Sequence, residues 1–139
     1  MDNSSFHLLI LTPYGCYFEG DVAFLEVHSE EYNLGILPGH APLVSTLAIS
    51  KMVIKGMGKT YTYAIGGGVI NVEKEKVTLI LNSVEREDEI DVVRAQEAKK
   101  RAEDRLKEAQ NNETIDVNRA KLAFMRAVNR IEVKSKGRD

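Results

Sequence analysis

Two short phrases that pair an aspartate with an arginine stand out in the last third of the chain. The letters IDVVRA occupy residues 90–95 and IDVNRA occupy residues 115–120. Arg126 and Arg130 follow the second phrase, and their i,i+4 spacing puts them on one face of a helix. Guanidinium groups bind phosphate and carboxylate groups through paired hydrogen bonds. One function that this pattern allows is therefore the binding of a phosphorylated ligand.

The elements that carry these residues are predicted to be two helices folded back on each other. Asp91 and Asp116 have the residue type and position of helix N-caps. Apolar residues at helical spacing form one stripe on each helix: Ala95, Ala98, Ala102, Leu106 and Ala109 on the first, and Ala120, Ala123, Ala127 and Ile131 on the second. The polar loop at residues 110–114 has a length that suits antiparallel helices. Because a seam of alanines buries little apolar surface, we expect a hairpin that opens without either helix melting.

Folding the helices back would gather several basic groups at one end of the hairpin. A register in which Ala98 faces Ala127 brings four guanidinium groups toward Asp91. These belong to Arg94, Arg101, Arg126 and Arg130. The cluster repels itself unless an anion or extra carboxylates fill it, and phosphate suits the planar guanidinium group. The alternative is a solvated basic face paired with Glu85, Glu97 or Glu132, and the charge pattern alone favours that alternative.

Residues 1–85 are predicted to form a separate domain of strands, followed by the helical domain of residues 86–139. Short strands are expected at residues 6–11, 17–18, 22–28, 52–55, 59–65, 69–72 and 77–81, with a break at 19–21 and hairpin turns at 56–58 and 73–76. Strands of this length and spacing favour an antiparallel sandwich or a flattened barrel.

Two further segments of the strand domain invite a chemical interpretation. The glycines at 66–68 lack the following helix and the Lys-Ser/Thr pair of a phosphate loop, so they indicate a bulge or a close backbone approach. Residues 35–43 read GILPGHAPL, a rigid loop that carries His40. We expect His40 to be hydrogen-bonded locally rather than catalytic. No His and Cys residues have metal-site spacing, and no nucleophile–base motif is visible.

The charge distribution divides the chain in the same way as the strand and helix patterns. Residues 1–89 hold 6 Lys or Arg against 12 Asp or Glu, whereas residues 90–139 hold 13 against 9. The two parts are therefore expected to meet different partners.

Cys16 is the only cysteine, which fits a reducing compartment. No segment approaches the roughly 20 apolar residues needed to span a bilayer, so any membrane association is expected to run through a protein partner.

These motifs together resemble the epsilon subunit family of F-type ATP synthases. The resemblance runs from about Phe6 to Val133. It rests on GILPGHAPL at 35–43, AIGGG at 64–68, the phrase at 90–95 and the two-helix end, in the expected order. It implies a ten-stranded β-sandwich followed by an α-helical hairpin.

The resemblance also implies a function and a location. Members of the family are non-catalytic subunits of the central rotor stalk, bound to the gamma subunit and the c-ring, at the cytoplasmic face of the bacterial plasma membrane. Their extended helices restrain ATP hydrolysis by meeting the beta and alpha subunits of the catalytic head. Neither nucleic-acid binding nor direct membrane insertion is implied.

In several bacterial members the folded hairpin binds ATP as a regulatory ligand, with no required cofactor. Carried over by position, the resemblance implies an ATP site at Glu85, Ile90, Asp91, Arg94, Ala95, Arg101, Arg126 and Arg130. It also implies rotor contacts at Pro38, Gly39 and His40.

Two other classes of function compete with this one. A free-standing module could capture an acidic partner or nucleic acid with its basic tail. Phe124 is the only aromatic residue after position 116, which argues against single-strand binding. A small hydrolase is disfavoured because no nucleophile–base pair is visible. Copurification with a gamma subunit separates the rotor subunit from the free-standing module.

Overall fold

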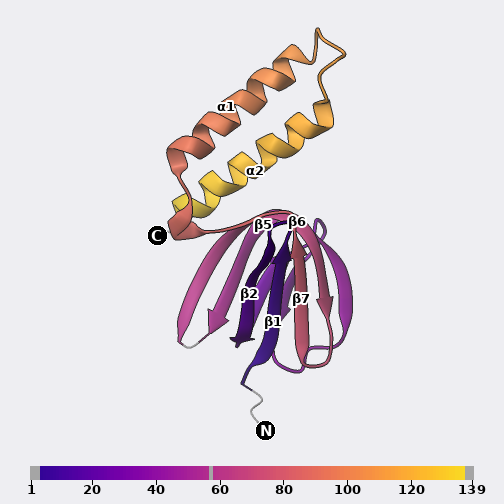
Figure 1. The fold of residues 1–139 in the computed structure, drawn as a ribbon, viewed down its shortest axis with the longest axis vertical. Coiled ribbons are helices and arrows are strands. Elements are labelled where there is room, and N and C mark those ends of the chain that lie inside the picture. The colour runs from indigo at the N-terminus through magenta and orange to yellow at the C-terminus, as the bar shows by residue number, and fades with distance from the viewer. Residues whose placement is uncertain (1–3, 57, 137–139) are drawn as a thin grey trace. The chain divides into compact units, whose positions relative to one another are not determined.

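The computed structural model describes residues 4–56 and 58–136, which fold as two compact units. The chain divides after Arg86 into an N-terminal strand unit and a C-terminal helical unit (Figure 1). The sequence placed this boundary after residue 85, one residue earlier.

Eight strands make up the strand unit over the described residues. They are β1 (Phe6–Thr12), β2 (Gly15–Val22), β3 (Phe24–His28), β4 (Asn33–Ile36), β5 (Leu43–Gly56), β6 (Lys59–Val72), β7 (Lys76–Leu81) and β8 (Val84–Arg86). Their hydrogen-bonded order is β2-β1-β7-β6-β5-β3-β4, and β8 pairs with β6. The hairpins predicted around residues 56–58 and 73–76 are confirmed as β5–β6 and β6–β7, although Met57 itself lies outside the described residues.

Two long strands carry the sheet from one layer of the sandwich to the other. β5 and β6 have 14 residues each and pair along most of their length. Residues 68–72 of β6 pair with β7, whereas residues 63–65 pair with β8. Residues 53–55 of β5 pair with β3. The predicted sandwich is therefore confirmed, and its strands number eight rather than about ten because β5 and β6 each serve both layers.

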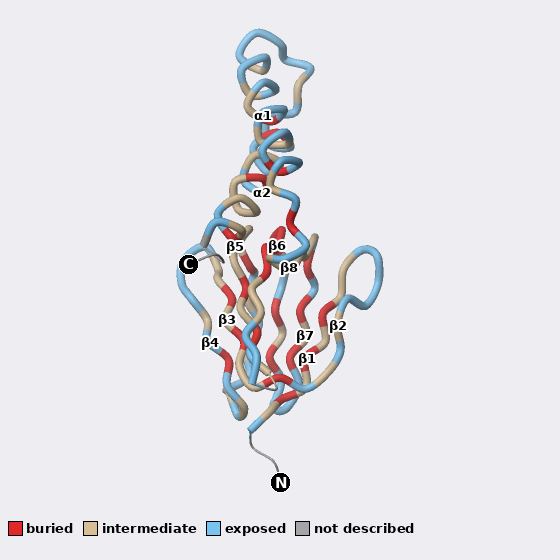
Figure 2. The backbone as a smooth tube through the Cα atoms, turned by 90° about the vertical axis from the view of Figure 1, so that its left-hand side faces the viewer, coloured by how far each residue is buried: buried red, intermediate tan, exposed pale blue. Residues whose placement is uncertain are grey.

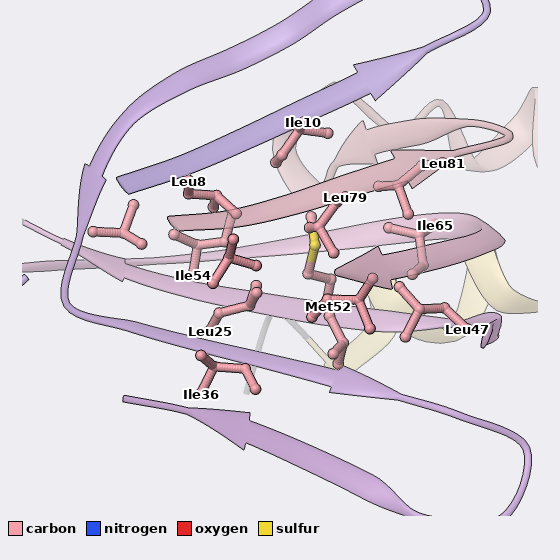
Figure 3. Packing of buried hydrophobic residues seen from close by; sticks show 14 of the residues in the cluster. Leu8, Ile10, Leu25, Ile36, Leu47, Met52, Ile54, Ile65, Leu79 and Leu81 are labelled. Carbon is pink, nitrogen blue, oxygen red and sulfur yellow. The ribbon is translucent and has the colours of Figure 1, made fainter. Parts of the chain in front are cut away.

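The core between the layers is formed by side chains that alternate, along each strand, between the inner and the outer face. Residues 6, 8 and 10 of β1 are buried, and so are residues 77, 79 and 81 of β7. Their side chains meet Leu25, Ile36 and Met52 from the opposite layer (Figure 3). Buried and more exposed positions alternate in the same way along the backbone in Figure 2. A period of two is what a strand with one buried face requires, so these residues form strands rather than helices.

At the glycines 66–68, the connection between β7 and β8 runs alongside β6 and keeps one antiparallel register, with 68 opposite 81 and 65 opposite 84. The Gly66 backbone N–H donates to Ser83 O, and the Asn82 backbone N–H donates to Gly67 O, both at 2.9 Å. A Cβ at Gly68 would overlap the carbonyl oxygen of Ile80. The pairings on either side, 47 with 68 and 49 with 66, keep one register, so no residue is inserted. The close backbone approach predicted from the sequence is confirmed, and the alternative of a bulge is wrong.

Three details of the strand predictions are wrong for physical reasons. β1 pairs with β7 in parallel, so the sheet is not wholly antiparallel. Residues 19–21 do not break a strand: β2 runs through them as an edge strand, where polar side chains remain exposed. The rigid loop begins only after Ile36, because the first two residues of the segment 35–43 belong to β4 and pair with β3.

The helical unit contains a short 3-10 turn, η1 (Glu87–Glu89), and two helices, α1 (Val92–Glu108) and α2 (Val117–Lys136). The helices pack against each other. Four alanines of the predicted stripes are buried, together with two larger residues: Ala95, Ala102, Ala120, Ala127, Ile90 and Val133. The predicted alanine seam is therefore confirmed. Among the described residues, neither helix is apolar enough over sufficient length to cross a membrane.

The close backbone approach at Gly68 predicts a large effect of a single methyl group. Gly68 has a φ of 155°, and the overlapping atom belongs to the backbone, so Gly68→Ala should destabilise the strand unit by roughly 2–4 kcal/mol. The five tyrosines all lie between residues 14 and 63, so their near-ultraviolet circular dichroism follows this unit alone during urea unfolding.

Gly58→Ala is the matched control, because Gly58 has a φ of 76° but open space around its Cα. This variant should lower the free energy of unfolding by only about 1–2 kcal/mol, which is the cost of placing a residue with a Cβ in a left-handed conformation. If both variants lose the same free energy of unfolding, the close backbone approach is not the reason for glycine at 68.

Candidate functional site

Asp91 begins α1 as its N-cap. Its backbone is extended, with φ −89° and ψ 104°, and its Oδ1 accepts a hydrogen bond of 3.1 Å from the Arg94 backbone N–H. Ile90 and Ala95 on either side are buried, at 4% and 3% exposure. The first phrase therefore starts a helix, fixes it to the interior of the helical unit and leaves the Arg94 side chain exposed.

The second phrase repeats this geometry at the start of α2. Asp116 Oδ1 accepts from the Arg119 backbone N–H at 3.1 Å, and the Ala120 backbone N–H donates to Asp116 O, also at 3.1 Å. Both predicted caps are confirmed. Because the two copies share one structural role, an aspartate three residues before an arginine is by itself no evidence for a ligand.

The return of α2 along α1 places the predicted arginines between the middle of the helical unit and the end that carries Asp91. Lys134 Nζ donates to the Glu87 carbonyl oxygen at 3.2 Å, and α2 also contacts η1. The helices are therefore antiparallel, as Figure 1 shows. Arg126, at the middle of α2, consequently lies near the level of Arg101 at the middle of α1, and Arg130 lies toward the start of α1, where Arg94 is. The side chains from α2 are half-buried and those from α1 are exposed.

These positions gather positive charge between the middle of the helical unit and its Asp91 end. Four guanidinium groups project from two helices whose shared seam is lined by small residues. The helical unit carries seven of the eight predicted ATP-site residues. Glu85 is the exception, because it lies in β8 of the strand unit, where it is half-buried. A flexible pair of arginines on each helix fits a polyphosphate better than a single carboxylate, because each guanidinium group can donate to separate oxygens.

The predicted rotor-contact residues form a tight turn between β4 and β5. The His40 backbone N–H donates to Leu37 O at 3.1 Å, and Gly39 has the positive φ of 84° that this turn requires. His40 Nδ1 donates to Ala41 O at 2.7 Å. The expectation of a locally hydrogen-bonded histidine is thus confirmed. Leu37, beside it, is 59% exposed, and Pro38 is half-buried.

An apolar surface on the strand unit was missed by the sequence interpretation. We call it the outer apolar face, and it consists of Leu9, Leu11, Val44, Val69 and Ile80. Cross-strand register places Leu11 beside Ile80 and Ile80 beside Val69. Ile80 is 56% exposed and Val44 is 70% exposed. The signal in the sequence is the uninterrupted runs LLIL at 8–11 and LIL at 79–81, since a strand that is apolar at every position has two faces to cover.

A hollow of about 290 Å³ lies elsewhere on the strand unit. Phe18, Tyr61 and Tyr63 supply aromatic walls, with Asp21 and Arg86 among the lining residues. The Arg86 guanidinium carbon lies 5.7 Å from the centre of the Tyr61 ring, a cation–π distance. Nowhere in the described ranges do three His, Cys, Asp or Glu residues gather in a way that could hold a metal ion.

The architecture defines a class of protein: a β-sandwich unit followed by an antiparallel helical hairpin. The profile for the ATP synthase Delta/Epsilon chain beta-sandwich domain matches residues 5–87, and that for the Delta/Epsilon chain long alpha-helix domain matches residues 88–135. Together they account for almost the whole chain.

Individual relatives agree with these domain matches. The ATP synthase epsilon chain of Bacillus cytotoxicus is 43% identical over 129 residues, covering 93% of this chain and 96% of the relative. The epsilon chain of Pediococcus pentosaceus is 36% identical over 134 residues, covering 95% and 96%. The chain therefore belongs to the ATP synthase epsilon chain family, in its bacterial form.

Solved structures show the same fold at low sequence identity. A chain of the Euglena gracilis mitochondrial ATP synthase, in a structure of OSCP, F1 and the c-ring, matches with a TM-score of 0.75 and 21% identity, over 88% of this chain and 76% of that one. A chain from the central stalk and c-ring of the Tetrahymena thermophila enzyme matches with a TM-score of 0.59 and 13% identity, over the full length of both chains.

Proposed function

We propose that this chain is a non-catalytic rotor subunit of a bacterial ATP synthase, which couples the gamma subunit to the c-ring and restrains ATP hydrolysis through its helices. The observation that carries the proposal is the match of both units, in order, to the epsilon chain family. The similar structures add support, since they come from assemblies of F1, the c-ring and the central stalk. Such a subunit would work at the cytoplasmic face of the plasma membrane, attached through its partners.

The outer apolar face is our candidate for the gamma contact. It extends over β1, β7, β6 and β5, with Val44, Val69 and Ile80 exposed and Leu9 and Leu11 half-buried, and exposed apolar patches on a small domain mark protein contacts. Pro38, Gly39 and His40 form a separate, rigid contact for the rotor, because their turn is held by two local hydrogen bonds. A rigid turn loses little conformational entropy on binding.

The helical unit is our candidate for the regulatory element. Its seam consists mostly of alanines, each of which contributes under about 1 kcal/mol on burial, compared with roughly 1.5–3 kcal/mol for a leucine. Each helix has its own aspartate cap, so each keeps its conformation when the seam opens. The opened helices would present basic residues to the beta and alpha subunits and restrain hydrolysis, and the closed hairpin would permit it.

ATP would stabilise the closed hairpin, because only antiparallel packing gathers arginines from both helices. In the open state Arg94 and Arg101 separate from Arg126 and Arg130, so the phosphates lose half of their donors. A ligand shifts a conformational equilibrium only by its differential affinity for the two states, and a complete switch needs about 5.5 kcal/mol. Several charge-assisted hydrogen bonds of about 1.5–3 kcal/mol each can supply this difference.

Loss of one arginine from the cluster should weaken ATP binding. Arg126→Ala should raise the Kd for ATP about tenfold or more, since a charge-assisted hydrogen bond contributes about 1.5–3 kcal/mol. Backbone NMR during an ATP titration should show shifts at Asp91, Arg94 and Arg130 in the unmodified chain. Arg119→Ala, in the first half of the same helix, should leave the Kd unchanged. Spectra unaffected by millimolar ATP would refute the nucleotide site.

The two capping aspartates provide a second control for the same titration. Asp91→Ala and Asp116→Ala each remove an equivalent cap worth about 1 kcal/mol. Only the first should also weaken ATP binding beyond the effect of helix fraying. Equal effects of the two variants on the Kd would leave Asp91 with a capping role alone.

Removal of the helical unit should release the restraint on hydrolysis. A chain that ends at Glu89 should keep the tyrosine circular dichroism of the intact strand unit, because the two units are compact separately. ATP hydrolysis by the reconstituted complex should rise severalfold. A chain that ends at Lys136 controls for trimming of the C-terminus. Unchanged hydrolysis with the shorter chain would contradict an inhibitory role.

A charge on the outer apolar face should prevent assembly with gamma. Ile80→Glu is tolerated by the free chain because Ile80 is 56% exposed, but it would bury an unpaired carboxylate in the contact. We expect copurification with gamma to be lost. Tyr14→Glu changes a residue of the strand unit that is 99% exposed and outside this face, and should copurify normally. Full copurification of the Ile80 variant would exclude this face as the gamma contact.

A further inference from the structure

Three titratable side chains meet at the β2 edge of the strand unit. His7 of β1 lies opposite Asp21 of β2 in the antiparallel register, and Glu19 precedes Asp21 by two residues on the same face of the strand. His7 Nε2 lies 2.8 Å from Glu19 Oε2, and His7 Nδ1 lies 3.3 Å from Asp21 Oδ1. Each ring nitrogen thus has a carboxylate of its own, and the imidazole bridges two successive outward positions of the edge strand.

The number of bonds in this bridge depends on the protonation of His7. A neutral imidazole has one N–H and donates to one carboxylate, whereas the imidazolium ion donates to both. When the ring is neutral, two carboxylates lie side by side on one strand with less positive charge to offset them. The hydrogen bonds to Glu19 first and Asp21 second raise the pKa of His7 above its ordinary value of 6.5, against a smaller opposing effect of burial. The His7 side chain is 38% exposed, so protons reach it freely.

Charged groups on the neighbouring strand do not replace this pairing. Lys76 of β7 is the register partner of His7 and is exposed, while the Glu75 carbonyl oxygen accepts the His7 backbone N–H at 3.1 Å. The cluster is also no chelating set, because its two carboxylates approach opposite nitrogens of the ring and do not converge on one point.

The strand held by this bridge buries little of itself, although it also contacts β5 and its Tyr17 ring meets the Tyr63 ring edge-on, with 6.3 Å between centroids. β2 is the last strand of the sheet order and pairs with β1. Its residues are mostly exposed: Val22 is buried, Phe18 is half-buried, and the first three residues are solvent-exposed. Segments with few buried apolar contacts open locally at low free energy. Phe18, Asp21 and Val22 also line the aromatic hollow, so any movement of β2 moves one of its walls.

We propose that His7 is a proton-operated clamp that fastens the edge strand β2 to β1 and thereby sets the mobility of one wall of the aromatic hollow. With His7 protonated, both carboxylates are engaged and β2 is held at two outward positions. With His7 neutral, one carboxylate is released and β2 opens more often. The clamp concerns the strand unit alone and does not depend on rotor assembly or ATP binding.

The direction of the pH dependence follows from the sign of the pKa shift. The pKa of His7 is higher in the folded state than in the unfolded chain, where it is about 6.5. The clamp therefore stabilises the folded strand unit fully at a pH below about 6.5. Its contribution disappears as the pH rises through the higher folded value. Opening of β2 is therefore favoured by alkaline pH.

Hydrogen exchange of the full chain tests the clamp between about pH 6 and about pH 8.5, which brackets the titration of a histidine with a raised pKa. After correction for intrinsic exchange, protection of the β2 amides should fall severalfold across this range. Protection of β4, the other edge strand, should change little and serves as the internal control. In His7→Gln, the fall at β2 should vanish.

An NMR titration of the imidazole separates the clamp from a merely structural role of His7. Glu19→Gln and Asp21→Asn change exposed side chains and spare the core. Each should lower the pKa of His7 and flatten the pH dependence of β2 exchange, with Glu19→Gln having the larger effect. The proposal is overturned if β2 protection is independent of pH in the unmodified chain, or if its pH dependence persists in His7→Gln.

Discussion

The passage of two strands through both layers of the sandwich is the constraint on which the strand unit depends. Where β6 passes between the layers, the connection from β7 to β8 stays beside it in direct backbone contact and in one antiparallel register. Three successive glycines allow that contact, since a side chain at Gly68 would occupy the position of a backbone oxygen. The same register fixes the outward direction of Ile80 and the position of β8 on β6.

The two units are stabilised in different ways, and this difference is what the proposed movement of the helices requires. Leucine, isoleucine and valine fill the sandwich core at close to zero exposure. The helical unit instead buries mainly alanines and relies on local features, the aspartate caps and high helix propensity. A unit whose stability comes mainly from local interactions, and little from tertiary packing, can change its tertiary arrangement while keeping its helices. The arginine cluster is then a property of the closed arrangement only.

The outward face of the strand unit combines apolar and titratable rows. The row through Leu11, Ile80 and Val69 is apolar, whereas the row through Asp21, His7 and Lys76 is charged. Both rows arise from the same alternation that builds the core on the inner side. The strand unit therefore offers a surface for association and, at its β2 edge, a group that responds to pH, without any change in the sandwich itself.

The sequence by itself determined the features that depend on near neighbours: the sandwich and hairpin classes, the two β-hairpin turns, both helix caps, the alanine stripes and the close approach at the glycines. Local periodicity and capping chemistry set all of these. It also predicted the arginines that the antiparallel helices bring to the same half-length of the hairpin, from its middle to its Asp91 end. Only the tertiary structure decided which strands become neighbours, and hence the parallel β1–β7 pair, the outer apolar face and the meeting of His7 with Glu19. These depend on register between residues far apart in the chain, where a one-residue slip would turn each side chain to the opposite face.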